Sequence, residues 1–370
     1  MIKKAEMVAL LKQLVETESP TNDKKAVDRV GAVLTEASLN LGAKLFHHPQ
    51  ENAGNHIVAQ WGESNLGEKG ILILGHMDTV FPLGTLKTMP FYEKDDKIFG
   101  PGVLDMKGGL VIALMALSLL LEKNQMPNCP VSILFTSDEE TGSATSRGLI
   151  EKLAAQAKLV LVCEPALLDG SLKTWRKGVG TFNIRAHGRA AHAGGAHADG
   201  RNAIEEMAHQ VLAIQKLTDY EKETTLNVGT IRGGTTSNVV PEFAEVEVDL
   251  RLLQSREYER INSAIQALSP VLEGTSLEIN GALNRPPMPF DETMEATFAK
   301  AQTIAKKIGM NLKAGGTGGA SDANFVAPLG IPVLDGLGTV GEGLHSSREY
   351  IFAESLPEKA QLLAGLLRDW

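Results

Sequence analysis

Short apolar runs alternate with amphipathic helical patterns through the first half of the chain. Four consecutive large apolar residues at 71–74 indicate a strand buried on both faces, and residues 131–135 and 159–163 have the same character. Strands that alternate with helices predict a mostly parallel sheet flanked by helices. Further elements are predicted as helices at residues 7–15, 26–34, 110–121 and 149–153, a strand at 56–61, and a Gly- and Pro-rich loop from residue 75 to 102.

The pattern changes at residue 177. Residues 177–285 predict the order βαββαβ, which is typical of a ferredoxin-like fold, and one strand alternates apolar and charged residues over 243–252. Such a sheet has one face exposed to solvent. We therefore expect an inserted lid domain at 177–285 and a discontinuous sheet domain at 1–176 and 286–370, which fits the length of 370 residues. The last part predicts a helix at 292–309, a loop at 315–322 and a strand at 331–334.

The composition narrows the function. The chain has a net charge of −9 and 43% hydrophobic residues, which argues against a nucleic-acid partner and fits a globular protein. The two cysteines exclude a disulfide framework and a cysteine-based zinc motif. The first helix is too polar for a signal sequence, and we expect no run of the roughly 18 apolar residues that span a membrane. These features predict a cytoplasmic protein that binds no membrane.

Polar side chains follow three of the predicted buried strands. His76 and Asp78 follow the first, Glu139 and Glu140 the second, and Glu164 the third. Ligands of open α/β sheets bind beyond the carboxyl ends of the strands. The repetition therefore predicts one functional site at this edge of the sheet.

The candidate ligands suit divalent metal ions. Asp105 precedes an apolar helix and His345 lies in a late loop, and both join His76, Glu140 and Glu164 as donors. Nitrogen and oxygen donors without thiolate favour zinc, although manganese or cobalt would accept them. Five groups exceed the needs of one catalytic zinc, so two metal ions bridged by one carboxylate account for the number. Glu139 is then available as the general base for a metal-bound water.

Several motifs resemble one known family. The chain is similar to the co-catalytic dizinc exopeptidases and deacylases, above all to glutamate carboxypeptidases, over nearly its whole length. The motifs that carry the resemblance are residues 74–80, 100–109, 138–143, 191–194, 237–241, 249–251, 321–323 and 345–350. The chain departs from the glutamate carboxypeptidases at Met106, where they have an acidic residue.

The resemblance implies the roles of the metal-site residues. Asp105 would bridge the two metal ions, and the peptide bond between Asp105 and Met106 would be cis. Glu140 and His345 would complete one metal site, and His76 and Glu164 the other. Asp78 would orient the ring of His76, and Glu139 would be the base.

The resemblance also implies roles for the inserted domain in a homodimer. His192 would reach the active site of the partner subunit and stabilise the tetrahedral intermediate, while Asn238 and Arg251 would bind substrate. From the residues alone, His192 could also be a surface histidine in a Gly-rich turn. Arg251 could equally belong to the solvated face of its strand.

The resulting hypothesis is a dizinc hydrolase that cleaves an amide bond beside an amino acid with a free carboxylate. An N-acyl-amino-acid deacylase, of the acetylornithine deacetylase or desuccinylase type, and a di- or tripeptidase remain alternatives within the class. Outside it, the fold could be a catalytically silent binding module. A serine or cysteine hydrolase is disfavoured, because the chain has no Gly-x-Ser-x-Gly motif and Cys163 ends an apolar strand.

Overall fold

The computed structural model describes residues 3–63 and 69–370, which form two compact units. The first unit contains the described residues up to Trp175, with Phe290–Thr317 and Ser321–Trp370. The second contains Arg176–Pro289 and Gly318–Ala320. Compared with the predicted range 177–285, it extends further at its end because Met288 pairs with Arg176 in an antiparallel bridge.

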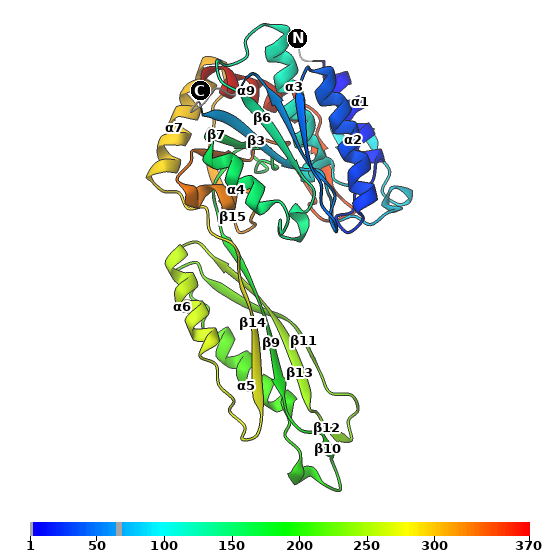
Figure 1. Cartoon of the computed structure of the whole chain (residues 1–370), viewed down its shortest axis with the longest axis vertical. Helices are drawn as coiled ribbons and strands as arrows, with labels where there is room; N and C mark the ends of the chain where they lie inside the picture. The colour runs from blue at the N-terminus through cyan, green and yellow to red at the C-terminus, as the bar shows by residue number, and fades with distance from the viewer. Residues whose placement is uncertain (1–2, 64–68) are drawn as a thin grey trace. The chain divides into compact units, whose positions relative to one another are not determined.

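The first unit is built on an eight-stranded sheet with the order β1-β2-β6-β3-β7-β16-β8-β15 (Figure 1). The central strands β6, β3, β7 and β16 are parallel, and β2 joins β6 antiparallel. The strands are β1 Lys44–His48, β2 His56–Trp61, β3 Gly70–His76, β6 Val131–Thr136, β7 Ala157–Val162, β8 Leu172–Arg176, β15 Ala314–Thr317 and β16 Val333–Asp335. The predicted α/β fold with a mostly parallel sheet is confirmed.

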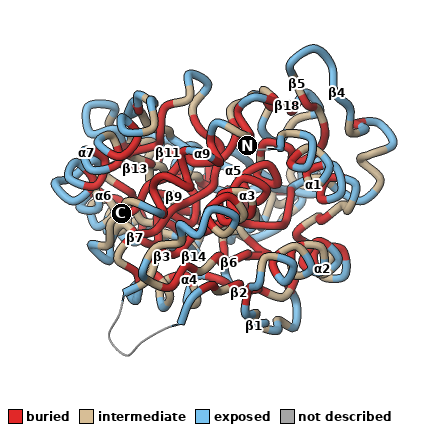
Figure 2. Tube along the Cα trace, turned by 90° about the horizontal axis from the view of Figure 1, so that it is seen from above, coloured by how far each residue is buried: buried red, intermediate tan, exposed pale blue. Residues whose placement is uncertain are grey.

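Both faces of the central sheet are covered. Ile71 and Ile73 join one core cluster, while Leu72 and Leu74 point to the opposite face and are equally buried. Figure 2 shows these strands and α3 as mostly buried. The helices are α1 Lys4–Glu16, α2 Lys24–Asn40, α3 Gly108–Glu122, α4 Arg147–Ala155, α7 Glu292–Lys307, α8 Ala323–Val326 and α9 Ser355–Asp369, with short turns η1 Thr85–Lys87, η2 Val103–Lys107, η3 Glu139–Thr141 and η5 Ala327–Leu329.

Three expectations about the first unit need correction. The predicted loop after residue 75 contains η1 and two strands of a small sheet with the order β17-β18-β5-β4, and the loop at 315–322 begins within β15. The segment Val103–Glu122 is long and apolar enough to cross a membrane by length and composition, with a mean hydropathy of 1.9. However, 83% of its apolar stretch is buried inside the protein, as in a core helix. The small sheet consists of β4 Tyr92–Lys94, β5 Lys97–Phe99, β17 Gly341–Glu342 and β18 Tyr350–Phe352.

The second unit has the predicted order βαββαβ. Its four-stranded antiparallel sheet has the order β11-β13-β9-β14, and its apolar face forms a separate core with the helices. On β13 the apolar positions Val246, Val248 and Leu250 are buried against this core. The elements are β9 Gly178–His187, β10 Ala191–His192, η4 His197–Asp199, α5 Ala203–Gln215, β11 Thr225–Gly233, β12 Val239–Val240, β13 Phe243–Leu252, α6 Ser255–Gln266 and β14 Ser276–Arg285.

Candidate active site

Three neighbouring parallel strands deliver polar side chains to one edge of the sheet. His76 ends β3 and pairs in register with Thr136, the last residue of β6. The chain then continues from β6 into η3, which carries Glu139 and Glu140, and from β7 to Glu164. The structure therefore brings the predicted residues of the three strand ends to the same edge.

Asp105 enters this edge on the irregular turn η2. Gly102 before the turn has φ of 74°, a conformation that favours glycine, and a Cβ there would lie 2.8 Å from Thr79 Cγ2. The peptide bond from Asp105 to Met106 is cis, as the resemblance implied. Met106 is buried, and its sulfur accepts a hydrogen bond from the His76 backbone N–H at 3.3 Å.

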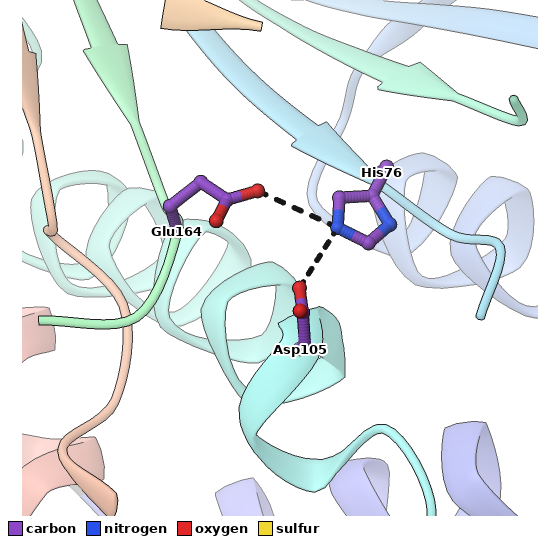
Figure 3. Close-up of side chains that lie close together, drawn as sticks. All are labelled: His76, Asp105 and Glu164. Carbon is purple, nitrogen blue, oxygen red and sulfur yellow. Dashed lines mark hydrogen bonds and ion pairs between the residues drawn. The ribbon is translucent and has the colours of Figure 1, made fainter. Parts of the chain in front are cut away.

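The side chain of Asp105 is shared between two groups of potential ligands. His76 Nε2 lies 3.1 Å from Asp105 Oδ1 and 3.5 Å from a Glu164 oxygen (Figure 3). On the other side, His345 Nε2 lies 3.1 Å from Asp105 Oδ2 and 3.2 Å from a Glu140 oxygen. Within each group the possible donor atoms lie within 4.8 Å of one another, so each group could hold a metal ion.

The charges at this edge are strongly perturbed. Burial lowers the pKa of His76, but its hydrogen bonds to Asp105, Asp78 and Glu164 outweigh this effect and raise the pKa well above its usual value. A hydrogen bond to Asp105 is the main reason that the pKa of His345 rises to about 10. Burial raises the pKa of Glu140. Converging carboxylates therefore create a strong demand for positive charge.

One buried atom supports a metal ion as the source of that charge. Glu140 Oε1 is buried and has no hydrogen-bond partner among residues 3–63 and 69–370. A buried carboxylate oxygen normally has a partner, because desolvation without one is costly. The donor set of imidazole and carboxylate groups is that of a catalytic zinc site. The residues present therefore fit two divalent metal ions.

Asp78 contacts both the ring of His76 and the turn that carries Glu139 and Glu140. His76 Nδ1 lies 3.0 Å from the Asp78 carbonyl oxygen and 3.5 Å from its carboxylate, so the backbone makes the closer contact with the ring. The Asp78 carboxylate accepts hydrogen bonds from Thr21 Oγ1 at 2.8 Å and from the backbone N–H groups of Glu139 and Glu140 at 3.4 and 3.3 Å. Asp78 thus fixes both a ligand ring and the turn of the proposed base.

The remaining predicted residues belong to the second unit. His192 and Asn238 lie together there, because β10 pairs with β12 and Ala193 N–H donates to the Asn238 carbonyl at 2.9 Å. His192 Nδ1 accepts from the N–H groups of Gly194 and Gly195 at 3.1 and 2.9 Å. A neutral His192 ring must then carry its proton on Nε2.

Arg251 has structural partners that the sequence pattern did not reveal. Its Nε and Nη2 donate to the Asp249 carboxylate at 2.8 and 2.9 Å, and Nη1 donates to the Gly318 carbonyl at 3.3 Å. These bonds give Arg251 a structural role within the second unit. Arg176 likewise donates to the Gly319 carbonyl at 3.2 Å, and these bonds attach Gly318–Ala320 to the second unit.

Glu349 is a site residue whose role the sequence did not predict. Its buried carboxylate accepts three backbone N–H groups, from Gly102 at 2.9 Å, Leu104 at 2.7 Å and Asp105 at 3.0 Å. Burial raises the pKa of Glu349 to about 7, against the effect of these bonds. Glu349 therefore holds the turn that aims Asp105.

Replacing Glu349 by Gln is expected to weaken metal binding by about 10–100-fold, the usual effect of losing a group that orients a ligand. Glutamine has an NH₂ group in place of one carboxylate oxygen, and this group cannot accept a hydrogen bond from the backbone N–H groups that face it. Metal affinity is measured by competition with a chromophoric chelator. Glu342→Gln is the matched control, because Glu342 is exposed on β17, is seven residues before Glu349, and accepts from Tyr350 Oη at 2.6 Å. Equal affinity in wild type and Glu349→Gln would contradict the assigned role.

Comparison with known proteins identifies the family. The model of "Peptidase family M20/M25/M40" matches residues 72–369. The chain belongs to this peptidase family. Carboxypeptidase G2 of Pseudomonas sp. (strain RS-16) is 30% identical to it, over 98% of this chain and 89% of that protein.

Other M20 relatives differ in their named activities. A succinyl-diaminopimelate desuccinylase of Rhodospirillum centenum (strain ATCC 51521 / SW) is 27% identical over 98% of this chain and 97% of that protein. The structure of aminopeptidase PepT from Bacillus cereus ATCC 10987 matches with a TM-score of 0.76 and 26% identity, over 99% of this chain and 98% of that one. The protein is therefore a hydrolase of the M20 metallopeptidase type.

Proposed function

We propose that this protein is a dizinc hydrolase that cleaves an amide bond beside an amino acid with a free carboxylate, as an exopeptidase like the carboxypeptidases. The observation that carries the proposal is Asp105, which presents one oxygen to each of two ligand groups. His76 and Glu164 would hold one metal ion, and Glu140 and His345 the other. Metal ions bound there would act as Lewis acids toward the amide carbonyl and water.

Glu139 is the group that we assign to proton transfer. It precedes Glu140 on η3 and belongs to neither ligand group. Its backbone N–H is tied to Asp78, which also contacts the ring of His76, so the base and a ligand share one support. In this role Glu139 takes a proton from the attacking water and later delivers it to the amine that leaves.

Arg251 and the strand end from which the chain continues to His192 lie at opposite ends of the β9–β13 ladder. On the β9–β13 ladder, Arg251 pairs with Val179 and Phe243 pairs with His187, the residue from which the chain continues to β10. At about 3.3 Å per residue, these two register positions are about 26 Å apart. We propose a homodimer in which the partner subunit supplies His192 and Asn238, and Arg251 binds the substrate carboxylate.

The outer edge of the second unit supports a homodimer. Its sheet ends at β11, which carries the exposed Ile231, and the neighbouring helix α5 exposes Ile204 and Leu212 at helical spacing. An open strand edge beside apolar side chains suits an interface between two identical subunits.

The proposal is tested with a panel of substrates after metal analysis. The protein is expected to contain two zinc ions per chain, to lose hydrolysis with a chelator and to regain it with zinc. N-acyl amino acids and short peptides with a free terminal carboxylate should be cleaved, and the same compounds amidated should be poor substrates. Equal cleavage of both forms would refute carboxylate recognition, and cleavage that survives removal of the metal would refute the dizinc mechanism.

The variant Arg251→Lys tests whether Arg251 binds the substrate carboxylate. Lysine keeps the positive charge but lacks the paired N–H donors with which a guanidinium group binds a carboxylate. KM for free-acid substrates should therefore rise about tenfold, with a smaller effect on kcat. Amidated substrates should be indifferent to the change. The matched control is Arg185→Lys, since Arg185 lies on the same sheet and is also paired with a carboxylate, Glu245, at 2.7 Å. An equal rise of KM in both variants would assign the effect to the sheet and not to the substrate.

A further inference from the structure

His56 lies in a buried polar cluster behind the turn that holds Glu139 and Glu140. It is the first residue of β2 and is fully buried. Its Nδ1 lies 3.0 Å from Oγ of Ser137, the residue after β6, and its Nε2 lies 3.0 Å from Oγ1 of Thr145, which precedes α4. Both ring nitrogens therefore contact hydroxyl groups of the segment that carries the proposed base.

The protons of both hydroxyls are already used. Ser137 Oγ lies 2.5 Å from the Gly54 carbonyl oxygen, which can only accept, so the Ser137 proton points there. Thr145 Oγ1 donates to Asp138 Oδ2 at 2.7 Å. Each hydroxyl can then only accept from His56. A neutral imidazole has one N–H, whereas these two contacts require two.

Asp138 is arranged as the counter-charge. Its Oδ2 accepts from both the backbone N–H and the hydroxyl of Thr145, at 2.6 and 2.7 Å, which are the short distances of bonds to a carboxylate. Its Oδ1 is buried without a hydrogen-bond partner among the described residues. The Thr145 hydroxyl therefore links a buried carboxylate to the ring of His56.

Several groups face the ring and act in opposite directions. Their net electrostatic effect lowers the pKa of His56 below its usual value, mainly through burial, and His48 on β1 acts in the same direction. The charge of Asp138, the bond to Thr145 and the charge of Asp322 raise it. If burial kept the ring neutral, one of the two contacts with hydroxyl oxygens would have no hydrogen atom. Because an unmade buried hydrogen bond is costly, we take the two contacts, and not burial, to decide the protonation state.

We propose that His56 is a positioning residue, held as an imidazolium whose two N–H groups tie Ser137 and Thr145 to strand β2. The turn with Glu139 and Glu140 lies between these two attachments. The effect of His56 on catalysis rests on the proposed function, whereas the protonation state of its ring does not depend on that function. When the ring loses a proton at alkaline pH, one attachment is lost and the turn of the base is loosened.

Nitrogen-15 NMR of histidine-labelled protein tests the state of the ring without using activity. We expect both nitrogens of His56 to show protonated chemical shifts at pH 7, with ring protons that exchange slowly. Thr145→Val removes the acceptor of Nε2–H and should leave that nitrogen unprotonated at the same pH, whereas Thr145→Ser keeps the hydroxyl and should match wild type. An unprotonated ring nitrogen in wild type at pH 7 would overturn the proposal.

The pH profile of kcat tests the positioning role. Wild type should lose kcat at alkaline pH, and Thr145→Val should move this loss to lower pH by about one to two units, the effect of one hydrogen bond to a buried cation. Thr145→Ser should keep the wild-type profile. If Thr145→Val and Thr145→Ser have the same profile, the positioning role is wrong. If no substrate is hydrolysed at all, the proposed function fails, and the NMR result still decides the state of His56.

Discussion

Replacing Glu139 by Gln is expected to lower kcat by about 10²–10⁴-fold, the contribution of a positioned general base. The amide has nearly the same shape as the carboxylate but cannot take a proton from water. Because Glu139 belongs to neither ligand group, the variant should still bind two metal ions per chain. The measurement is steady-state kinetics together with metal content by mass spectrometry.

Glu140→Gln is the matched control, since it makes the same chemical change one residue further along η3. Glu140 lies 3.2 Å from His345 Nε2, and its buried Oε1 has no hydrogen-bond partner within the described part of the chain. Its replacement should therefore reduce metal content as well as activity. If Glu139→Gln loses metal and Glu140→Gln retains it, the two roles are reversed. If Glu139→Gln keeps most of its kcat, the base is a different group.

His76, Glu140 and Glu164 could be placed together from the sequence because each comes at or after the end of a buried strand. The apolar run that ends before His76 indicated a strand buried on both faces, and parallel neighbours with polar residues after them meet at one edge. Local pattern therefore placed His76, Glu140 and Glu164 together without knowledge of any contact. The separation of Glu139 from the ligands also came from counting donors.

The supporting residues could not be predicted in this way, because their partners are distant in sequence. Glu349 contacts the backbone of Asp105, 244 residues away, and His56 contacts Thr145, 89 residues away. No local pattern indicates which carboxylate or imidazole will be buried against such partners. Arg251 likewise has a distant partner, since it donates to the Gly318 carbonyl, 67 residues away, as well as to Asp249.

Some elements were missed although the sequence carries a signal for them. Helix α9 has buried residues Leu356, Ala360, Leu363 and Leu367 at helical spacing, and it packs against α3. Strands β4 and β5 are three residues each, too short for alternation to be distinguished from a loop. Helix α9 was thus missed despite its length and periodicity, whereas β4 and β5 were missed because they are short.

Replacing His192 by Ala is expected to lower kcat by about 10²–10³-fold, the effect of removing one donor to a developing oxyanion. The N–H groups of Gly194 and Gly195 hold Nδ1 as an acceptor, so Nε2–H is the donor that the variant loses. If His192 acts in the partner's site, mixing inactive His192→Ala chains with inactive Glu139→Gln chains should restore activity. Each mixed dimer regains one site with both groups, which gives about a quarter of wild-type activity after random exchange of equal amounts.

The matched control carries both substitutions on one chain and is mixed with wild type. When sites are completed across subunits, neither site of a mixed dimer is intact, and activity falls to about a quarter of that of wild type alone at equal amounts. When each chain supplies its own His192, activity falls only to about one half, and the two single variants do not complement each other. Native mass spectrometry confirms that the subunits have exchanged. Two mixtures with opposite expected directions thus separate a loss of His192 in trans from a general loss of stability.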